Sequence, residues 1–188
     1  MSLVIGIDPS LTSTGIIVLR DGAVELAQTT KNRPELGTIE RVKEIREKIL
    51  KIHYTVGKTP SLIVIEGFSY GSKGRSVFDI AYLGWRIRED LEYLKTNGVP
   101  WIEVSPAQLK QFATGKGNAN KEIILQQVYK RWGVEFSDNN QADAYVLAQI
   151  GRAYLGKADD LTSFQQEIIS ALKGEKTPKK KKVKEATP

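Results

Sequence analysis

The hydrophobic residues of this chain fall into short apolar runs and into longer stretches in which apolar positions recur every three or four residues. The short runs predict five strands, at residues 3–8, 15–20, 23–30, 62–66 and 101–104. The longer stretches predict helices at residues 36–54, 76–96, 121–131, 141–155 and 163–172, with another that opens at Ser105-Pro106. Three strands come before any helix, and strand–helix alternation follows. This order predicts an α/β fold with a mixed five-stranded sheet, three antiparallel strands first and then parallel ones, flanked by helices.

The positive charge of the chain is concentrated at its C-terminal end. The formal net charge of the 188 residues is +6, and residues 173–188 contain seven lysines and two glutamates, so the remainder is almost neutral. The length suits one domain with a substantial core. We therefore expect a folded domain over residues 1–172 and a disordered, lysine-rich tail over 173–188, which can attract phosphate groups.

Several classes of protein are excluded by composition. The chain has no cysteine, which excludes a disulfide framework, thiolate zinc sites and a cysteine nucleophile. No apolar run approaches the ~18 residues that a membrane span needs. The N-terminus lacks the charged segment and cleavage site of a signal peptide. We expect a soluble, cytoplasmic protein that has no contact with a membrane.

Three acidic residues stand at positions where a strand or helix would otherwise be apolar. Asp8 ends the first predicted strand, Glu66 ends the strand at 62–66, and Asp143 lies near the start of the helix at 141–155. If the two strands are neighbours, their carboxylates meet at one edge of the sheet, where they repel each other and are costly to bury. A divalent cation with oxygen ligands removes that cost. The pattern predicts a magnesium or manganese site, with Asp143 as a third ligand.

Four segments together resemble the ordered motifs of a known family. GIDPSLTSTG, IEGFSYG, SPAQLKQFATGKGNANKE and DNNQADAYVLAQ, spread over residues 3–155, are similar to those of the RuvC family of Holliday-junction resolvases. The compact form is most similar to the phage-type members. The resemblance implies a ribonuclease H-like fold and a homodimer. It also implies an Mg²⁺-dependent endonuclease of DNA recombination and repair, associated with nucleoid or phage DNA, that cuts two strands of a four-way junction symmetrically.

The resemblance also assigns roles to the acids. It implies that Asp8 bridges two Mg²⁺ ions about 3.5–4 Å apart, with Glu66 and Asp143 as further ligands, and that Mn²⁺ can substitute. No small-molecule cofactor is expected. The family often has Asp or His three residues before the last acid, and this chain has Asn140 there. Asn140 can offer a carbonyl oxygen but no charge, and Asp138 is a second candidate for the same place.

The candidate DNA contacts come from two of these motifs. Lysines of SPAQLKQFATGKGNANKE fall where the family contacts phosphates, and its Gly-rich turn opens a helix whose N–H groups can bind a phosphate. In GFSYGSKGRS, basic side chains can cover phosphates while an aromatic ring stacks on an unpaired base. The predicted contacts are Lys110, Lys116, Lys121, Lys73, Arg75, Phe68 and Tyr70.

The helix at 76–96 carries apolar residues on more than one stripe. One stripe would pack on the sheet, and the other could pair with the same helix of a second subunit, so that two identical sites cut symmetrically.

Three other interpretations stay open. GIDPSLTSTG also resembles the phosphate loop of actin-like kinases and chaperone ATPases, which need two such domains. A related nuclease that acts on flaps, forks or RNA would use the same acids. A junction-binding protein without activity is suggested by Asn140.

Overall fold

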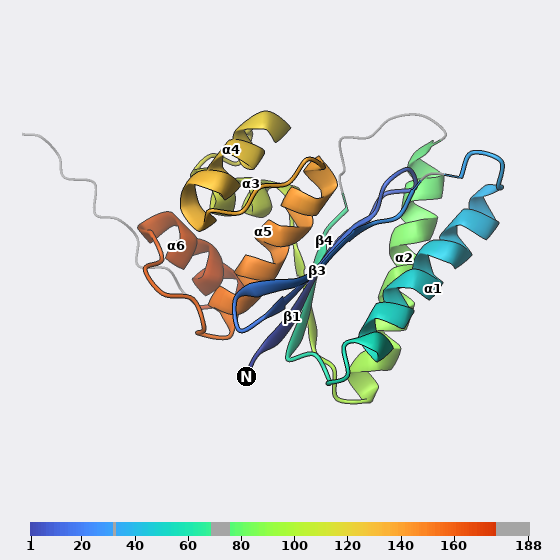
Figure 1. The fold of residues 1–188 in the computed structure, drawn as a ribbon, viewed down its shortest axis with the longest axis horizontal. Helices are drawn as coiled ribbons and strands as arrows, with labels where there is room; N and C mark the ends of the chain where they lie inside the picture. Colours follow the sequence, from blue (N-terminus) through green and yellow to red (C-terminus); the bar gives the residue numbers. More distant parts are fainter. Residues whose placement is uncertain (32, 69–75, 176–188) are drawn as a thin grey trace, which may run out of the picture.

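A five-stranded sheet lies between two layers of helices (Figure 1). The computed structural model describes residues 1–31, 33–68 and 76–175, except the side chains of 53–55 and 76. Its strands are β1 (Leu3–Asp8), β2 (Gly15–Arg20), β3 (Ala23–Thr29), β4 (Leu62–Glu66) and β5 (Trp101–Val104). Its helices are α1 (Thr38–Thr55), α2 (Ser76–Thr96), α3 (Pro106–Thr114), α4 (Lys121–Trp132), α5 (Asn139–Tyr154) and α6 (Ser163–Leu172). The predicted fold class is confirmed. The boundary of the domain at residue 172 stays a prediction, because residues 176–188 lie outside the described part.

The order of the strands brings two chain-distant strand ends together. The sheet has the order β3-β2-β1-β4-β5, with β1 antiparallel to β2 and parallel to β4. In the parallel pair, Ile7 lies opposite Ile65. Because the two strands run in the same direction from that pair, the next residues, Asp8 and Glu66, end at the same edge of the sheet.

Both faces of the sheet are buried, which is why its central strands read as continuous apolar runs. Alternate residues of β1 face opposite layers. Val4 belongs to the core under α3–α6, whereas Ile5 and Ile7 belong to the core under α1 and α2. Figure 1 shows this division, with α1 and α2 on one side of the sheet and α3–α6 on the other.

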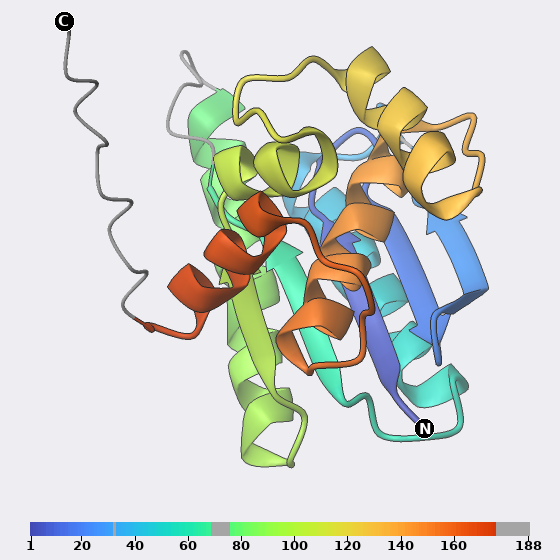
Figure 2. The ribbon, with the colours of Figure 1, turned by 90° about the vertical axis from the view of Figure 1, so that its left-hand side faces the viewer.

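Helix α5 crosses the sheet at very short range (Figure 2). A Cβ atom built on Gly6 of β1 would lie 2.0 Å from the carbonyl oxygen of Ala144, and one built on Gly15 would lie 2.0 Å from that of Asn140. These two glycines are required for close backbone approach rather than for an unusual dihedral angle. Residues 142–151 of α5 are buried as a result.

Local capping sets where the helices begin. Ser105 forms a capping box with Gln108, and Pro106 follows at the first position, as the sequence predicts. Helix α5 begins two residues earlier than predicted, because the side chain of Asp138 accepts a hydrogen bond from the main-chain N–H of Asn140 at 2.8 Å.

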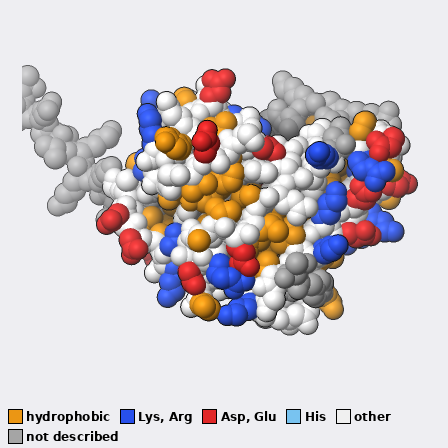
Figure 3. Space-filling model, viewed as in Figure 1, with side chains coloured by type: hydrophobic (Ala, Val, Ile, Leu, Met, Phe, Trp, Pro, Cys, Tyr) orange, Lys and Arg blue, Asp and Glu red, His pale blue; other side chains and the backbone are white. Residues whose placement is uncertain are grey.

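The exposed surface over α1 carries both signs of charge side by side (Figure 3). Arg33 there pairs with Glu35 at 2.7 Å and with Glu44 at 2.8 Å. Exposed pairs of this kind contribute little stability. Separately, none of the helices in the described ranges combines the length and apolarity that crossing a bilayer requires.

The close approach of α5 gives a direct test of the packing. We expect Gly6→Ala to lower the free energy of unfolding by more than about 3 kcal/mol, because the new methyl group meets backbone that cannot rotate away. Gly117→Ala is the control, since its Cβ would lie 3.4 Å from the nearest atom, and it should cost less than about 0.5 kcal/mol. Urea unfolding followed by circular dichroism measures both, and equal values for the two variants would contradict this packing.

Candidate active site

The three predicted acids converge at one edge of the sheet. Asp8 is the last residue of β1, Glu66 is the last residue of β4, and Asp143 lies in the second turn of α5. Asp8 and Asp143 are buried, with 6% and 9% of their surfaces exposed. Each of the three is electrostatically coupled to at least one of the others. The structure therefore brings together the residues that the sequence predicts as a site.

Asp8 and Glu66 form a carboxyl pair. Burial, and then the nearby charge of Glu66, hold the pKa of Asp8 well above its usual range. Burial also raises the pKa of Glu66, although the hydrogen bond from Asp8 opposes that shift. In both groups, burial favours the protonated form of the carboxyl group.

Asp143 adds a third carboxyl group to the same small volume. Burial, followed by the charge of Asp8, raises the pKa of Asp143 to about 7. The positive charges of Lys121 and Lys110 act in the opposite direction on Asp143 and on Glu66. The lysines do not cancel the cost of burying three acids, so the site favours a bound proton or cation.

The donor set fits a divalent metal ion. The three carboxyl groups supply the oxygen ligands that Mg²⁺ and Mn²⁺ prefer. Burial, and to a lesser extent their mutual repulsion, raises their pKa values, and a bound cation would favour the charged forms. Among the described residues, however, no three acidic or imidazole side chains already have the arrangement that holds a metal ion. Metal binding would therefore require the carboxyl groups to be deprotonated and the side chains to rotate.

Asn140 and Asp138, the two candidates for a fourth ligand, lie in one hydrogen-bond network. The amide Nδ2 of Asn140 donates to Ser13 Oγ and to Asp138 Oδ1, both at 3.0 Å. Asp138 also accepts from Thr29 Oγ1 at 2.6 Å. Burial raises the pKa of Asp138, but these hydrogen bonds outweigh it and the net shift is downward. Asp138 thus has both oxygens engaged. Within the described residues, no hydrogen bond reaches the side-chain oxygen Oδ1 of Asn140.

The predicted DNA contacts lie at different distances from the acids. Lys110 on α3 and Lys121 at the start of α4 act on the acids electrostatically, so they border the site. Lys116 is exposed on the turn between those helices. Three other predicted contacts, Lys73, Arg75 and Tyr70, lie outside the described residues.

Phe68 packs back onto α2 in this structure. Its ring centroid lies 5.4 Å from that of Trp85, and the guanidinium carbon of Arg88 lies 4.0 Å from its centroid. Phe68 and Glu66 both line a small cleft of about 70 Å³, together with Pro9 and Ile80 among others. A role for Phe68 in stacking on a base stays a prediction.

Sequence reasoning did not identify the group around Arg88. Arg88 is 6% exposed and forms an ion pair with Glu103 of β5 at 2.7 Å. The signal was present, because a single arginine interrupts the apolar face of α2 between the buried residues Ile87 and Leu91. A charge on a buried helix face needs a partner, but the sequence did not show which residue supplies it.

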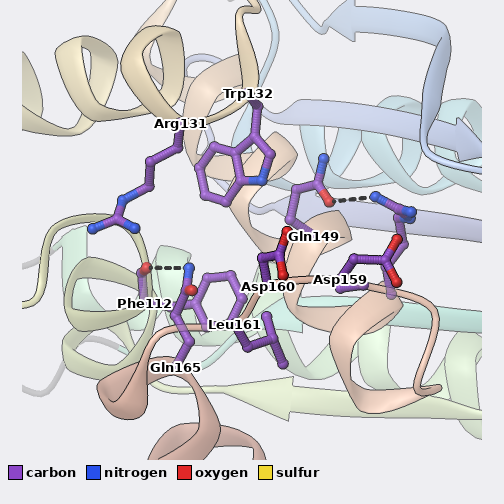
Figure 4. A pocket seen from close by; sticks show the side chains of 10 residues that line it. Phe112, Arg131, Trp132, Gln149, Asp159, Asp160, Leu161 and Gln165 are labelled. Atoms are coloured by element: carbon purple, nitrogen blue, oxygen red, sulfur yellow. Dashed lines mark hydrogen bonds between the residues drawn. The ribbon is translucent and has the colours of Figure 1, made fainter.

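A larger pocket, of about 370 Å³, lies between α4, α5 and α6, away from the acids (Figure 4). Several of its polar side chains are engaged in hydrogen bonds. Gln149 accepts from Arg152 at 3.0 Å, and Gln165 donates to the carbonyl oxygen of Phe112 at 3.1 Å. Size alone would favour this pocket, but the unbalanced charges are at the sheet edge, so we place the chemistry there.

The sheet order and the flanking helix layers are those of a ribonuclease H-like fold. Two solved structures confirm the fold. A Thermus thermophilus RuvC structure has a TM-score of 0.63 at 24% identity and covers 83% of this chain and 98% of its own. T. thermophilus RuvC in complex with Holliday junction substrate has a TM-score of 0.65 at 21% identity, covering 84% and 98%.

The sequence comparison identifies the family. The model of the family "Crossover junction endodeoxyribonuclease RuvC" matches residues 4–150. The crossover junction endodeoxyribonuclease RuvC of Synechococcus sp. (strain WH7803) is 27% identical over 157 residues, covering 79% of this chain and 96% of the relative. The chain therefore belongs to the RuvC family of crossover junction endodeoxyribonucleases, and the predicted resemblance is confirmed at that level.

The raised pKa of Asp143 predicts how stability depends on pH in the metal-free protein. An acid whose pKa is higher in the folded than in the unfolded chain binds its proton more readily when folded. The stability that this proton provides is complete below about pH 4 and is lost as the pH rises through about 7. In EDTA, Asp143→Asn should therefore be more stable than the wild type at pH 8, by on the order of a few kcal/mol, and similar at pH 4.

Urea unfolding at the two pH values measures this difference. A wild-type chain that is as stable as Asp143→Asn at pH 8 would contradict the burial of a charged carboxylate at this position.

Proposed function

We propose that this chain is a divalent-metal-dependent endonuclease that resolves four-way DNA junctions by symmetric phosphodiester hydrolysis. The observation that carries the proposal is the convergence of three carboxyl groups, from β1, β4 and α5, beside Lys110 and Lys121. Carboxyl groups that can bind a cation, bordered by lysines that attract phosphate, suit the cleavage of a phosphodiester. Membership of an endodeoxyribonuclease family supports the same conclusion.

Each residue has a defined part in this proposal. Mg²⁺, or Mn²⁺ as a substitute, would be held by Asp8, Glu66 and Asp143. The side-chain amide oxygen of Asn140 would supply a neutral ligand. Two bound ions would activate a water molecule and stabilise the leaving oxygen of the DNA strand. Lys121 and Lys110 would attract the scissile phosphate and draw the backbone onto the acids.

Branched DNA is the substrate that the comparisons favour. One of the similar structures is described as a complex with Holliday junction substrate, and we extend that substrate to this chain. The phage-type subgroup, the association with cellular or phage DNA, and recombination and repair as the setting belong to the same proposal. We also propose that residues 1–172 form the nuclease domain and that the lysine-rich residues 173–188 add a sequence-independent attraction to DNA.

A homodimer would supply the two sites that symmetric cleavage requires. Helix α2 exposes a stripe of aromatic residues at helical spacing. Phe78, Tyr82, Trp85 and Tyr93 are 79%, 39%, 62% and 65% exposed, while Leu83, Ile87 and Leu91 of the same helix are buried against the sheet. A second copy of α2 is the occupant that we propose for this stripe.

Cleavage of synthetic DNA tests the function. In Mg²⁺ we expect paired nicks on a labelled four-way junction and little cutting of a Y-fork or linear duplex. Asp8→Asn should lower the rate by at least about 100-fold, or about 2.7 kcal/mol, while Asp159→Asn, in the pocket of Figure 4, should leave it unchanged. Equal cutting of forks would broaden the substrate to branched DNA in general. Binding without cleavage in Mg²⁺ or Mn²⁺ would instead indicate a junction-binding protein, in which Asn140 fails to complete the metal site.

Light scattering tests the dimer. The wild type should have the mass of two chains at micromolar concentration, and Phe78→Glu combined with Tyr93→Glu should have the mass of one, because buried carboxylates oppose association. Tyr129→Glu, at a 59% exposed position of α4, is the control and should stay dimeric. A monomeric wild type would overturn the proposal for α2.

A further inference from the structure

We propose that Arg88 of α2 is a positioning residue for Glu66. Arg88 fixes the main chain at the end of β4, and through it the place of the Glu66 carboxyl group in the metal site. This inference rests on the proposed function, because it assigns Arg88 a part in metal binding. Arg88 is neither one of the three acids nor one of the candidate DNA contacts, although it packs against Phe68.

The guanidinium group of Arg88 joins three elements at once. Its Nε and Nη2 atoms donate to Glu103 Oε2 of β5 at 2.8 Å and 2.7 Å. Nη1 donates to the carbonyl oxygen of Gly84 at 2.9 Å, and Nη2 donates to the carbonyl oxygen of Glu66 at 3.3 Å. The planar group thus connects α2, β5 and the last residue of β4.

The surroundings of Arg88 leave little room for movement. Phe68 covers one face of the guanidinium group at 4.0 Å. A Cβ atom on Gly84 would lie 2.3 Å from the Phe68 ring, and one on Gly67 would lie 2.8 Å from Glu103 Oε1. Gly67 and Phe68, which follow Glu66 in the chain, are therefore packed against Glu103 and Arg88. Both of them line the small cleft that Glu66 also lines.

Burying the charge of Arg88 costs free energy, and packing alone does not require a charge at this position. Leu83, Ile87 and Leu91 fill the neighbouring positions of α2 without charge, and an apolar replacement of a buried ion pair is often equally stable. What an apolar side chain cannot do is donate to the main-chain oxygen of Glu66. Hydrogen bonds that orient the side chains binding a metal typically change its affinity about 10–100-fold. The bond from Arg88 to the main chain of Glu66 would act in the same sense, by fixing the backbone that carries the carboxyl group.

The chain offers a matched control in a second arginine–carboxylate pair. Arg46 of α1 donates through Nε and Nη2 to the two carboxylate oxygens of Asp90 of α2, both at 2.6 Å. This pair is also partly buried, with 21% and 14% of the two side chains exposed. It joins α1 to α2 and makes no contact with Glu66, so it contributes to the same helix without touching the site.

Calorimetric titration of metal-free, DNA-free protein with Mn²⁺ tests the inference. Arg88→Lys should lower the affinity for Mn²⁺ about 10–100-fold, because a single ammonium group cannot bond Glu103, Gly84 and Glu66 together. Arg46→Lys should stay within about twofold of the wild type. In junction cleavage, Arg88→Lys should lower kcat with little change in KM for the DNA.

A second variant keeps the inference testable if Arg88→Lys does not fold. Glu103→Gln weakens the hold on Arg88 while retaining a hydrogen-bond acceptor, and it should lower the Mn²⁺ affinity about tenfold. An affinity within twofold of the wild type in the folded variant, or an equal loss in Arg46→Lys, would overturn the role of Arg88. A wild-type chain that binds no Mn²⁺ and cuts no junction would instead overturn the proposed function.

Discussion

The close packing of α5 on the sheet is the constraint on which the rest of the structure depends. The helix backbone lies against the backbone of β1 and β2 because Gly6 and Gly15 have no side chain to separate them. That approach buries α5 along most of its length and sets how far it lies from the strand ends. Asp143 is buried beside Asp8 and Glu66 as a consequence of helix position, and a helix even one methyl group further away would place it elsewhere.

The same packing makes the site electrostatically unbalanced. Packing α5 onto the sheet removes much of the hydration of three carboxyl groups. This burial is the largest cause of each raised pKa. The two basic residues at the rim, Lys110 and Lys121, only partly offset this. The network around Asp138 is different, because its hydrogen bonds satisfy the charge locally. The structure thus separates acids that need a cation from an acid that stabilises a helix start.

Much of this arrangement could be predicted from the sequence, since strand ends and apolar runs are local signals. The five strands and the acids that end two of them follow from patterns within a few residues. The meeting of Asp8 with Glu66 is expected only if their strands are neighbours, and the sheet order supplies that condition. Long-range partners could not be predicted in the same way. Arg88 is a charge on an apolar helix face, but only the tertiary structure shows that it reaches Glu103 and the main chain of Glu66. Likewise, Asp138 is a helix cap as well as a candidate ligand, which explains why α5 begins before its predicted start.

The position of α5 in the chain also governs when the site can exist. Gly6 and Ala144 touch although about 140 residues separate them, and contacts between such distant positions slow folding because a long loop must close first. During synthesis, the strands that carry Asp8 and Glu66 leave the ribosome well before the helix that carries Asp143. An incomplete chain therefore has two of the acids and exposes the apolar face that α5 later covers. The full trio of carboxyl groups forms only after α5 has been synthesised.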